Sequence, residues 1–312
     1  MEISVVIPLH NGAAWIEATL GSMDAQTVRP TEVVVVDDGS TDGGGKLVES
    51  FRFSDGSAVK TIRHDKPLGI AMSRNHGASV AHGEWLGFCD HDDLWHPRRI
   101  ERIGQAAAEY PARGAIATEA MGFALEGDRP RLESRLRGQM VDHWVSDDEL
   151  GTLVSLVPSC EGGYRELRFE DFQQDTGVPT ATICFSRDLF GLIGGYPTWN
   201  NATGDWLLHS AAAVLAPILV IRESMVFYRI RPASESDDDS RLAQGALTAI
   251  LALRLGDLPD DRPVGPIYHH LVRSGAAAGL SLPEVLGFAL LGRFGIAETA
   301  GLMKTMINSR RK

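Results

Sequence analysis

Residues 33–42 read Val-Val-Val-Val-Asp-Asp-Gly-Ser-Thr-Asp, and this stretch decides the fold class. Four β-branched residues in a row predict a strand that is apolar on both faces, as in a parallel sheet covered by helices. The strand ends on Asp37 and Asp38, where burying a carboxylate is costly unless it has a partner. The glycine after them permits a tight turn, and the hydroxyl residues beyond it can cap a helix. The stretch therefore predicts a core strand with polar side chains at its carboxyl end.

The same pattern repeats through the first third of the chain. Further strands are predicted at 3–7, 59–62 and 85–89, and helices at 13–25, 70–81 and 97–110. Strands that alternate with helices predict an α/β fold with a Rossmann-like, mostly parallel central sheet and helices on both faces. Ligands of such sheets bind beyond the carboxyl ends of the strands. The polar residues expected there are Asn11, Asp37, Asp38, Asp90 and Asp92.

Beyond residue 110 the pattern weakens. Residues 127–175 have no clean period and receive no assignment. Strands are predicted at 180–185 and 218–228, with a helix that begins near residue 205. The acidic run at 236–240 is interpreted as a linker, so we expect a main domain over 1–236 and a C-terminal helical extension over 241–312.

The extension combines apolar residues with the terminal sequence Arg310-Arg311-Lys312. Such a combination can lie on an anionic membrane surface. Packing on the main domain, or contact with a second copy in a homo-oligomer, is the other interpretation and the favoured one.

Bulk composition excludes some partners. The formal net charge of -11 argues against general nucleic-acid binding, which needs surplus Lys and Arg. A nucleotide is still compatible, because a bound cation can offset charge locally. The three cysteines, without a CxxC spacing, are interpreted as thiols in a reducing compartment. The first residues lack a basic region, and no apolar stretch predicts a membrane span, so we expect a cytoplasmic protein.

Asp90-His91-Asp92-Asp93 follows the apolar run 85–89. In an extended segment, residues two apart face the same way, so Asp90 and Asp92 present their carboxylates together. Two carboxylates favour Mg²⁺ or Mn²⁺, which are usually held with substrate phosphates. The alternative is a solvated acidic turn in which Asp93 caps the next helix.

In this order, the segments resemble family two of the glycosyltransferases, which has the GT-A fold. The resemblance covers roughly residues 3–236 and rests on Val6-Ile7-Pro8-Leu9-His10-Asn11-Gly12, Gln26-Thr27, residues 33–42, Arg74-Asn75-His76-Gly77, Gly83-Glu84-Trp85, residues 90–93, Leu94-Trp95-His96-Pro97, Gly194-Gly195-Tyr196, Gly204-Asp205-Trp206 and Tyr228-Arg229.

The resemblance implies roles for individual residues. Asp90 and Asp92 match the family's metal and ribose motif, and Asp205 matches the general base for the acceptor hydroxyl. The positions that match nucleotide-sugar contacts are Pro8, Asn11, Asp37, Asp38, Lys66, Arg74 and Asp90.

Two departures from the family pattern affect these roles. Gly204 stands where the family often has Glu, and Arg231 stands where it often has His. A guanidinium has no lone pair for a metal, so Arg231 is instead a candidate for direct contact with the nucleotide-sugar's diphosphate.

Aromatic and histidine residues receive simpler interpretations. Trp199 and Asn200 lie just before Asp205 and suit sugar stacking and hydroxyl recognition, which makes them candidates for the acceptor site. Trp206 is a further candidate there, although we expect it, like Trp15, to pack in the core. Single histidines, including His64, are interpreted as surface or hydrogen-bonded residues, and the glycines at 43–45 as a flexible connection.

The sequence therefore predicts an inverting, metal-dependent glycosyltransferase that uses a nucleotide-sugar, with a UDP-sugar favoured. A saccharide or lipid-linked acceptor in surface-polysaccharide synthesis is implied by the resemblance. One alternative is a catalytically degenerate nucleotide-sugar-binding protein. Another is a metal-dependent nucleotidyltransferase, which would need a basic phosphate loop near the first strand, and residues 8–14 contain no Lys or Arg.

Overall fold

A computed structural model describes residues 1–133, 141–156, 162–173, 178–198 and 204–232. The chain divides into two compact units. The first comprises Met1–Arg168, Val178–Tyr196 and Ala211–Pro232, and the second Phe169–Gly177, Pro197–Ser210 and Ala233–Lys312.

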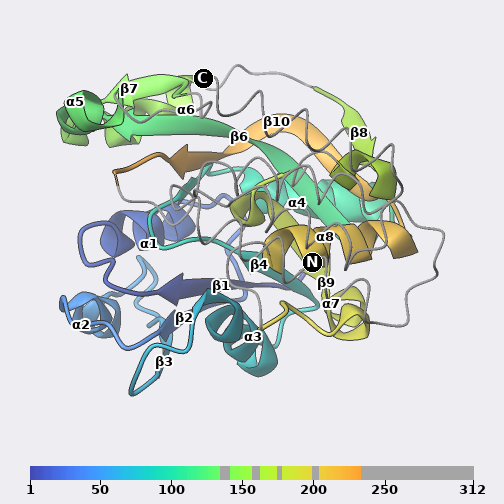
Figure 1. The fold of residues 1–312 in the computed structure, drawn as a ribbon, viewed down its shortest axis with the longest axis horizontal. Coiled ribbons are helices and arrows are strands. Elements are labelled where there is room, and N and C mark those ends of the chain that lie inside the picture. Colours follow the sequence, from blue (N-terminus) through green and yellow to red (C-terminus); the bar gives the residue numbers. More distant parts are fainter. Residues whose placement is uncertain (134–140, 157–161, 174–177, 199–203, 233–312) are drawn as a thin grey trace, which may run out of the picture. The chain divides into compact units, whose positions relative to one another are not determined.

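The first unit is built on a sheet with strand order β3-β2-β1-β4-β9-β6-β10-β5 (Figure 1). Strands β1 (Ile3–Leu9), β2 (Glu32–Asp37), β3 (Lys60–Arg63) and β4 (Trp85–Phe88) are all parallel. Their carboxyl ends therefore lie at one edge of the sheet.

The other strands make the sheet mixed. They are β5 (Leu94–Trp95), β6 (Ala115–Leu125), β7 (His143–Val145), β8 (Tyr164–Leu167), β9 (Ile183–Ser186) and β10 (Ile218–Arg229). Strand β9 is antiparallel to both β4 and β6, whereas β10 is parallel to β6 and antiparallel to β5 and β8. Strand β7 pairs in parallel with β6.

Helices cover both faces of the sheet. The face that carries Ile7 packs against α1 (Ile16–Asp24), α2 (Gly44–Ser50) and α4 (Arg99–Glu109). The opposite face carries Val6 and packs against α3 (Ile70–Val80), where a Cβ on Gly77 would lie only 2.4 Å from Cγ1 of Val6. On this second face, Phe190 of α7 (Arg187–Ile193) packs against Phe88, with ring centroids 5.4 Å apart.

Short elements connect these parts. They are η1 (Glu126–Asp128), α5 (Arg129–Leu132), η2 (Asp147–Thr152), α6 (Leu153–Leu156) and η4 (Thr180–Thr182). The second unit contains η3 (Phe169–Gln173). Helix α8 (Gly204–Leu215) has residues in both units.

The α/β prediction is confirmed, with β1, β2, β3, β4 and β10 all close to their predicted positions. The glycines at 43–45 are not a flexible connection, because α2 begins at Gly44 after Gly43 adopts a left-handed φ of 91°. Strand β6 was not predicted, and 127–175 contains β7 and β8. The helical extension at 241–312 lies outside the described residues, and its boundary stays a prediction.

No described helix has both the length and the apolar character required to span a bilayer.

Candidate active site

The loops that follow β1 and β2 are joined by hydrogen bonds. The backbone N–H of Asp38 donates to the carbonyl of Leu9 at 2.7 Å, and Asn11 N donates to Ser40 Oγ at 3.0 Å. Asn11 adopts a left-handed φ of 51°, and its Oδ1 accepts from the N–H of Thr41 at 2.9 Å. The exposed Asn11 thus lies at the carboxyl edge of the sheet, where its nucleotide contact was predicted.

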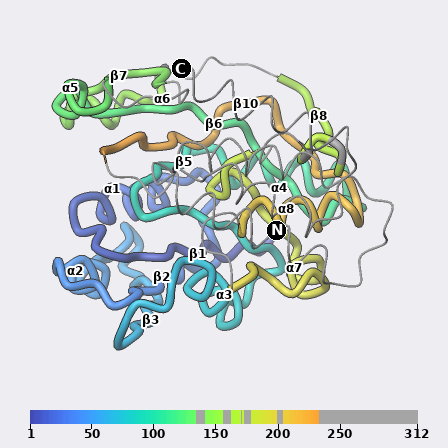
Figure 2. Tube along the Cα trace, in the orientation of Figure 1, coloured from blue at the N-terminus to red at the C-terminus, as the bar shows by residue number. Residues whose placement is uncertain are grey.

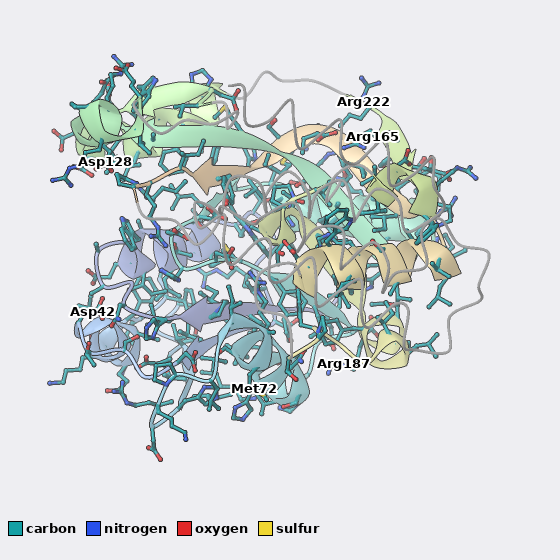
Figure 3. All side chains as sticks on the ribbon, viewed as in Figure 1. Asp42, Met72, Asp128, Arg165, Arg187 and Arg222 are labelled. Carbon is teal, nitrogen blue, oxygen red and sulfur yellow. The ribbon has the colours of Figure 1, made fainter. Side chains whose placement is uncertain are left out.

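A second connection joins the same two loops. The carboxylate of Asp42 accepts from the N–H of Ala13 at 2.7 Å and from that of Gly44 at 2.9 Å (Figure 3). Helices α1 and α2, which start from these loops, lie next to each other (Figure 2).

Asp37 and Pro8 are both buried near the carboxyl ends of their strands. The carboxylate of Asp37 is buried and accepts from Ser40 N at 2.8 Å and from the guanidinium of Arg63. Pro8 is buried inside β1, opposite Val36 of β2. Both residues thus hold the strand ends in place, and their direct contact with nucleotide stays a prediction.

Asp38 organises the loop between β3 and α3. Its Oδ1 accepts from His64 Nδ1 at 2.7 Å and from Leu68 N at 2.8 Å, and its Oδ2 accepts from Gly69 N at 2.8 Å. Burial alone would raise the pKa of Asp38, but the hydrogen bonds from His64 and the two backbone N–H groups outweigh it and lower that pKa. Asp38 therefore positions the 64–69 loop, while its contact with a base stays a prediction.

Gly39 is required by the same loop. It has a φ of 70°, and a Cβ there would lie 2.9 Å from Cδ of Pro67. The neighbouring Lys66 is exposed, so its ammonium is accessible to an anionic ligand, as its predicted role requires.

Asp90 is paired with Arg74. Nη2 of Arg74 lies 2.6 Å from Oδ1 of Asp90, and the guanidinium carbon lies 5.1 Å from the ring centroid of Tyr196. Asn75 fixes Tyr196 in turn, because its side chain donates to the Tyr196 carbonyl at 2.7 Å and accepts from its N–H at 2.8 Å. Two predicted ligand residues, Arg74 and Asp90, are thereby brought together at the carboxyl end of β4.

Asp92 is paired with Arg231. Nε of Arg231 lies 2.6 Å from Oδ2 of Asp92, and the guanidinium carbon lies 4.7 Å from the ring centroid of Trp15. Arg229, at the end of β10, donates from Nε to the backbone carbonyl of Asp92 at 2.9 Å. The segment after β10 thus contacts the acidic motif at residues 90–93. The contact brings together Asp92 and Arg231, which are far apart in the sequence.

The other two residues of the motif have structural contacts. His91 Nδ1 lies 3.2 Å from the Pro8 carbonyl, to which it donates, and a Cβ on Gly12 would lie 2.2 Å from the His91 ring. Asp93 Oδ1 accepts from Arg229 N at 2.9 Å. Burial, followed by the charges of Asp92 and Asp90, raises the pKa of Asp93 well above its ordinary value.

The residues at this edge do not fit a metal ion held by the protein alone. Each carboxylate of the predicted metal pair, Asp90 and Asp92, already accepts from a guanidinium. In the described ranges, no three His, Cys, Asp or Glu side chains are grouped so that they could hold a metal ion. Arg231 stands where a third ligand was in question, and a guanidinium cannot be one.

The predicted base, Asp205, belongs to the second unit. It lies in the first turn of α8, where a carboxylate is favoured by the helix dipole, and its Oδ1 accepts from Trp206 N at 2.8 Å. Trp206 is 3% exposed, and its Nε1 donates to the Phe172 carbonyl at 2.7 Å. Trp206 therefore packs in the core, as expected from the sequence, and a buried indole cannot stack on a sugar. Trp199 and Asn200 lie outside the described residues.

Two residues that contact the site, His64 and Trp15, were given no role in it by the sequence interpretation. His64 directly follows β3, and the rule that selected Asp38 and Asp90, a polar residue after a parallel strand, also selects His64. Trp15 was interpreted as core, but it is only partly buried and lies beneath Arg231. No sequence pattern indicates that second contact, because it joins segments more than 200 residues apart.

A family model matches this chain. The model of glycosyl transferase family 2 covers residues 4–171, which is more than half of the chain. The chain therefore belongs to glycosyl transferase family 2, as its sequence motifs predicted.

Curated relatives agree with this assignment over a shorter stretch. Glycosyltransferase GlyG of Streptococcus pneumoniae is 34% identical over 110 residues, or 35% of this chain and 36% of that protein. Amylovoran biosynthesis glycosyltransferase AmsB of Erwinia amylovora is 33% identical over 104 residues, or 33% of this chain and 34% of that protein. The matched stretch thus spans about a third of these relatives' length.

Solved structures confirm the GT-A fold. TarS 1-349 of S. aureus in complex with UDP superimposes with a TM-score of 0.62 at 18% identity, covering 100% of this chain and 91% of that one. The mannosyltransferase PcManGT of Pyrobaculum calidifontis, in complex with GDP-Man and Mn2+, gives a TM-score of 0.59 at 20% identity, covering 100% and 86%.

Proposed function

We propose that this protein transfers a sugar from a nucleoside-diphosphate sugar to an acceptor hydroxyl, with inversion at the anomeric carbon. The observation that carries the proposal is the pairing of Asp90 with Arg74 and of Asp92 with Arg231 at the carboxyl edge of the sheet. Guanidinium groups recognise phosphate, and ligands of α/β sheets bind at this edge.

The donor and acceptor classes are supported by the related proteins. The structural neighbours were solved with UDP, with UDP-GlcNAc and with GDP-Man. We favour a UDP-sugar, as the sequence interpretation did. AmsB is named for the biosynthesis of amylovoran, which supports a saccharide or lipid-linked acceptor in surface-polysaccharide assembly.

The proposed reaction is a single displacement. The acceptor oxygen forms a bond to the anomeric carbon, while the bond from that carbon to the diphosphate oxygen breaks and its electron pair stays with the diphosphate. Asp205 receives the hydroxyl proton as general base. Arg74 holds the negative charge of the donor, since charge-assisted hydrogen bonds from Arg to phosphate are short and strong.

A thermal-shift panel tests donor binding. Purified protein is heated with UDP, GDP, dTDP or CMP, each with and without Mn²⁺, because a ligand that binds the folded state raises its melting temperature. We expect UDP to give the largest shift. The absence of a shift with every nucleotide, with and without Mn²⁺, would refute the proposal.

Asp205→Asn separates an enzyme from the alternatives. The asparagine keeps the size of the side chain but cannot take a proton, so nucleotide affinity should be unchanged while hydrolysis and transfer of the bound donor are lost. A wild-type protein that binds nucleotide but turns over no donor would instead favour a degenerate binding protein. Release of diphosphate from a nucleoside triphosphate would favour a nucleotidyltransferase.

A further inference from the structure

The contacts that hold Arg231 include two of different kinds. Its Nε donates to the Asp92 carboxylate at 2.6 Å, and its guanidinium carbon lies 4.7 Å from the Trp15 ring centroid. The Arg231 side chain is 21% exposed to solvent. A planar cation that is paired on its edge and stacked on its face has little freedom to move away, yet a ligand can still reach it.

Arg74 repeats this arrangement at the other carboxylate of the motif. It is paired with Asp90 and lies over the ring of Tyr196. Both carboxylates expected to hold a metal therefore already have a fixed positive partner. A divalent cation at these carboxylates would be repelled by two guanidinium groups, and it would have to share the oxygens that they use.

We propose that Arg231 replaces the metal ion of this site, so that nucleotide-sugar binding and transfer need no divalent cation. The inference rests on the proposed function and deepens it, because it assigns the group that neutralises the diphosphate. As the bond from the anomeric carbon to the diphosphate oxygen breaks, the electron pair moves onto the diphosphate, and the guanidinium stabilises that charge without gaining or losing a proton. A guanidinium carries five N–H donors, so pairing through Nε is compatible with donation to phosphate by the terminal nitrogens.

Arginine is better suited to this position than lysine. A lysine ammonium has no plane to stack on Trp15, and its strongly hydrated charge sits on a flexible stem. Arg231→Lys should therefore keep the charge but lose its fixed position, and it should bind diphosphate with an affinity between those of the wild type and Arg231→Ala.

The test compares UDP and GDP binding by calorimetry with protein that has been treated with EDTA and with protein supplied with Mn²⁺. We expect the wild-type affinity to differ by less than about threefold between the two conditions. A change of that size is no larger than the loss of one weak contact would cause. Arg231→Ala should lose about 10- to 100-fold in affinity, as expected for a charge-assisted hydrogen bond, and Mn²⁺ should not restore it. Hydrolysis of the bound donor should follow the same pattern.

Arg222→Ala is the matched control. Arg222 is an exposed arginine on β10, and it projects outward from the strand (Figure 3). This variant should bind as the wild type does. Urea denaturation of each variant checks its folding, and Arg231→Lys replaces Arg231→Ala in the comparison if the alanine variant does not fold.

The outcomes separate the two hypotheses. Loss of UDP and GDP binding after EDTA treatment, with full recovery in Mn²⁺, would overturn the role of Arg231 and leave the proposed function intact. Failure of the wild type to bind either nucleotide in both conditions would refute the proposed function itself. Equal affinities of Arg231→Ala and the wild type in EDTA would also overturn the inference.

Discussion

Nδ1 of His64 lies 2.7 Å from Oδ1 of Asp38, and both side chains are almost completely buried. The other nitrogen of the imidazole, Nε2, lies 2.9 Å from Nδ1 of His76 on α3. Asp38 also accepts from the N–H groups of Leu68 and Gly69. One carboxylate at the end of β2 thus fixes the end of β3, the following loop and the start of α3.

Asp38→Asn should destabilise the protein. An amide offers one acceptor oxygen in place of two, and its NH₂ group would face a donor, so an unfavourable contact replaces a hydrogen bond. We expect a loss of about 1–3 kcal/mol in the free energy of unfolding at pH 7, measured by urea denaturation.

The same substitution should change the response to acid. Because the folded-state pKa of Asp38 is lowered, its stabilising contribution is present above the unfolded pKa of about 3.9 and is lost as pH falls through the folded value. The difference between wild type and Asp38→Asn should therefore shrink below about pH 4. A difference that stays constant from pH 7 to pH 3 would contradict the assigned cause.

Arg74→Ala should weaken nucleotide binding. The substitution leaves Asp90 without its guanidinium partner and removes a positive charge from the proposed diphosphate site, so the affinity for UDP should fall about 10- to 100-fold. Calorimetry measures the loss. Arg187→Lys is a useful comparison, since Arg187 donates to the Gly83 carbonyl and lies outside the proposed site. A loss of affinity in Arg187→Lys as large as that in Arg74→Ala would indicate a general effect on folding.

Trp15→Leu should act on binding through Arg231. A leucine preserves apolar bulk but removes the aromatic face under the guanidinium, so Arg231 should be less well fixed and the affinity for UDP should fall about threefold to tenfold. Trp15→Phe keeps an aromatic face and should restore most of the affinity. Equal affinities of the Leu and Phe variants would show that stacking does not position Arg231.

Local sequence patterns predicted the parallel part of the fold well. Strands β1, β2 and β4 are continuous apolar runs that end on polar residues, and this pattern requires no knowledge of distant partners. Strand β6 was missed because Ala115–Leu125 mixes small, acidic and apolar residues, and it is a strand because β9 and β10 pair with it on either side. Helix α2 was missed because its first residues are glycines, which have a low helix propensity. Tertiary packing overrides that propensity in the folded protein.

In the candidate site too, residues marked by a local pattern could be predicted, whereas contacts between distant segments could not. Asp90 and Asp92 were identified from their position after a strand. Arg74 and Arg231 were also identified as candidate ligand contacts, but their pairing with these carboxylates was not, since Arg74 comes from α3 and Arg231 from the segment after β10. Asp37 and Asp38 look equivalent in the sequence, and only the structure shows that Arg63 pairs with the first and His64 with the second.

A pair of glycine substitutions tests the packing of the acidic motif. Gly12→Ala would place a Cβ 2.2 Å from the His91 ring, so either the ring or the loop after β1 must move. The His91 ring donates to the Pro8 carbonyl, and the His91 backbone carbonyl accepts from Oγ1 of Thr19 at 2.9 Å. These two hydrogen bonds limit how far His91 can move. We expect a loss of about 1–3 kcal/mol in the free energy of unfolding, the usual cost of overpacking a fixed site. Gly21→Ala, in the interior of α1, adds a Cβ that would meet no heavy atom within 4 Å apart from the nearby helix backbone and chain neighbours, so it should instead stabilise the protein by about 0.5–1 kcal/mol. Urea denaturation measures whether each variant lowers or raises the free energy of unfolding. A Gly12→Ala protein as stable as the wild type would show that His91 is not held in this position.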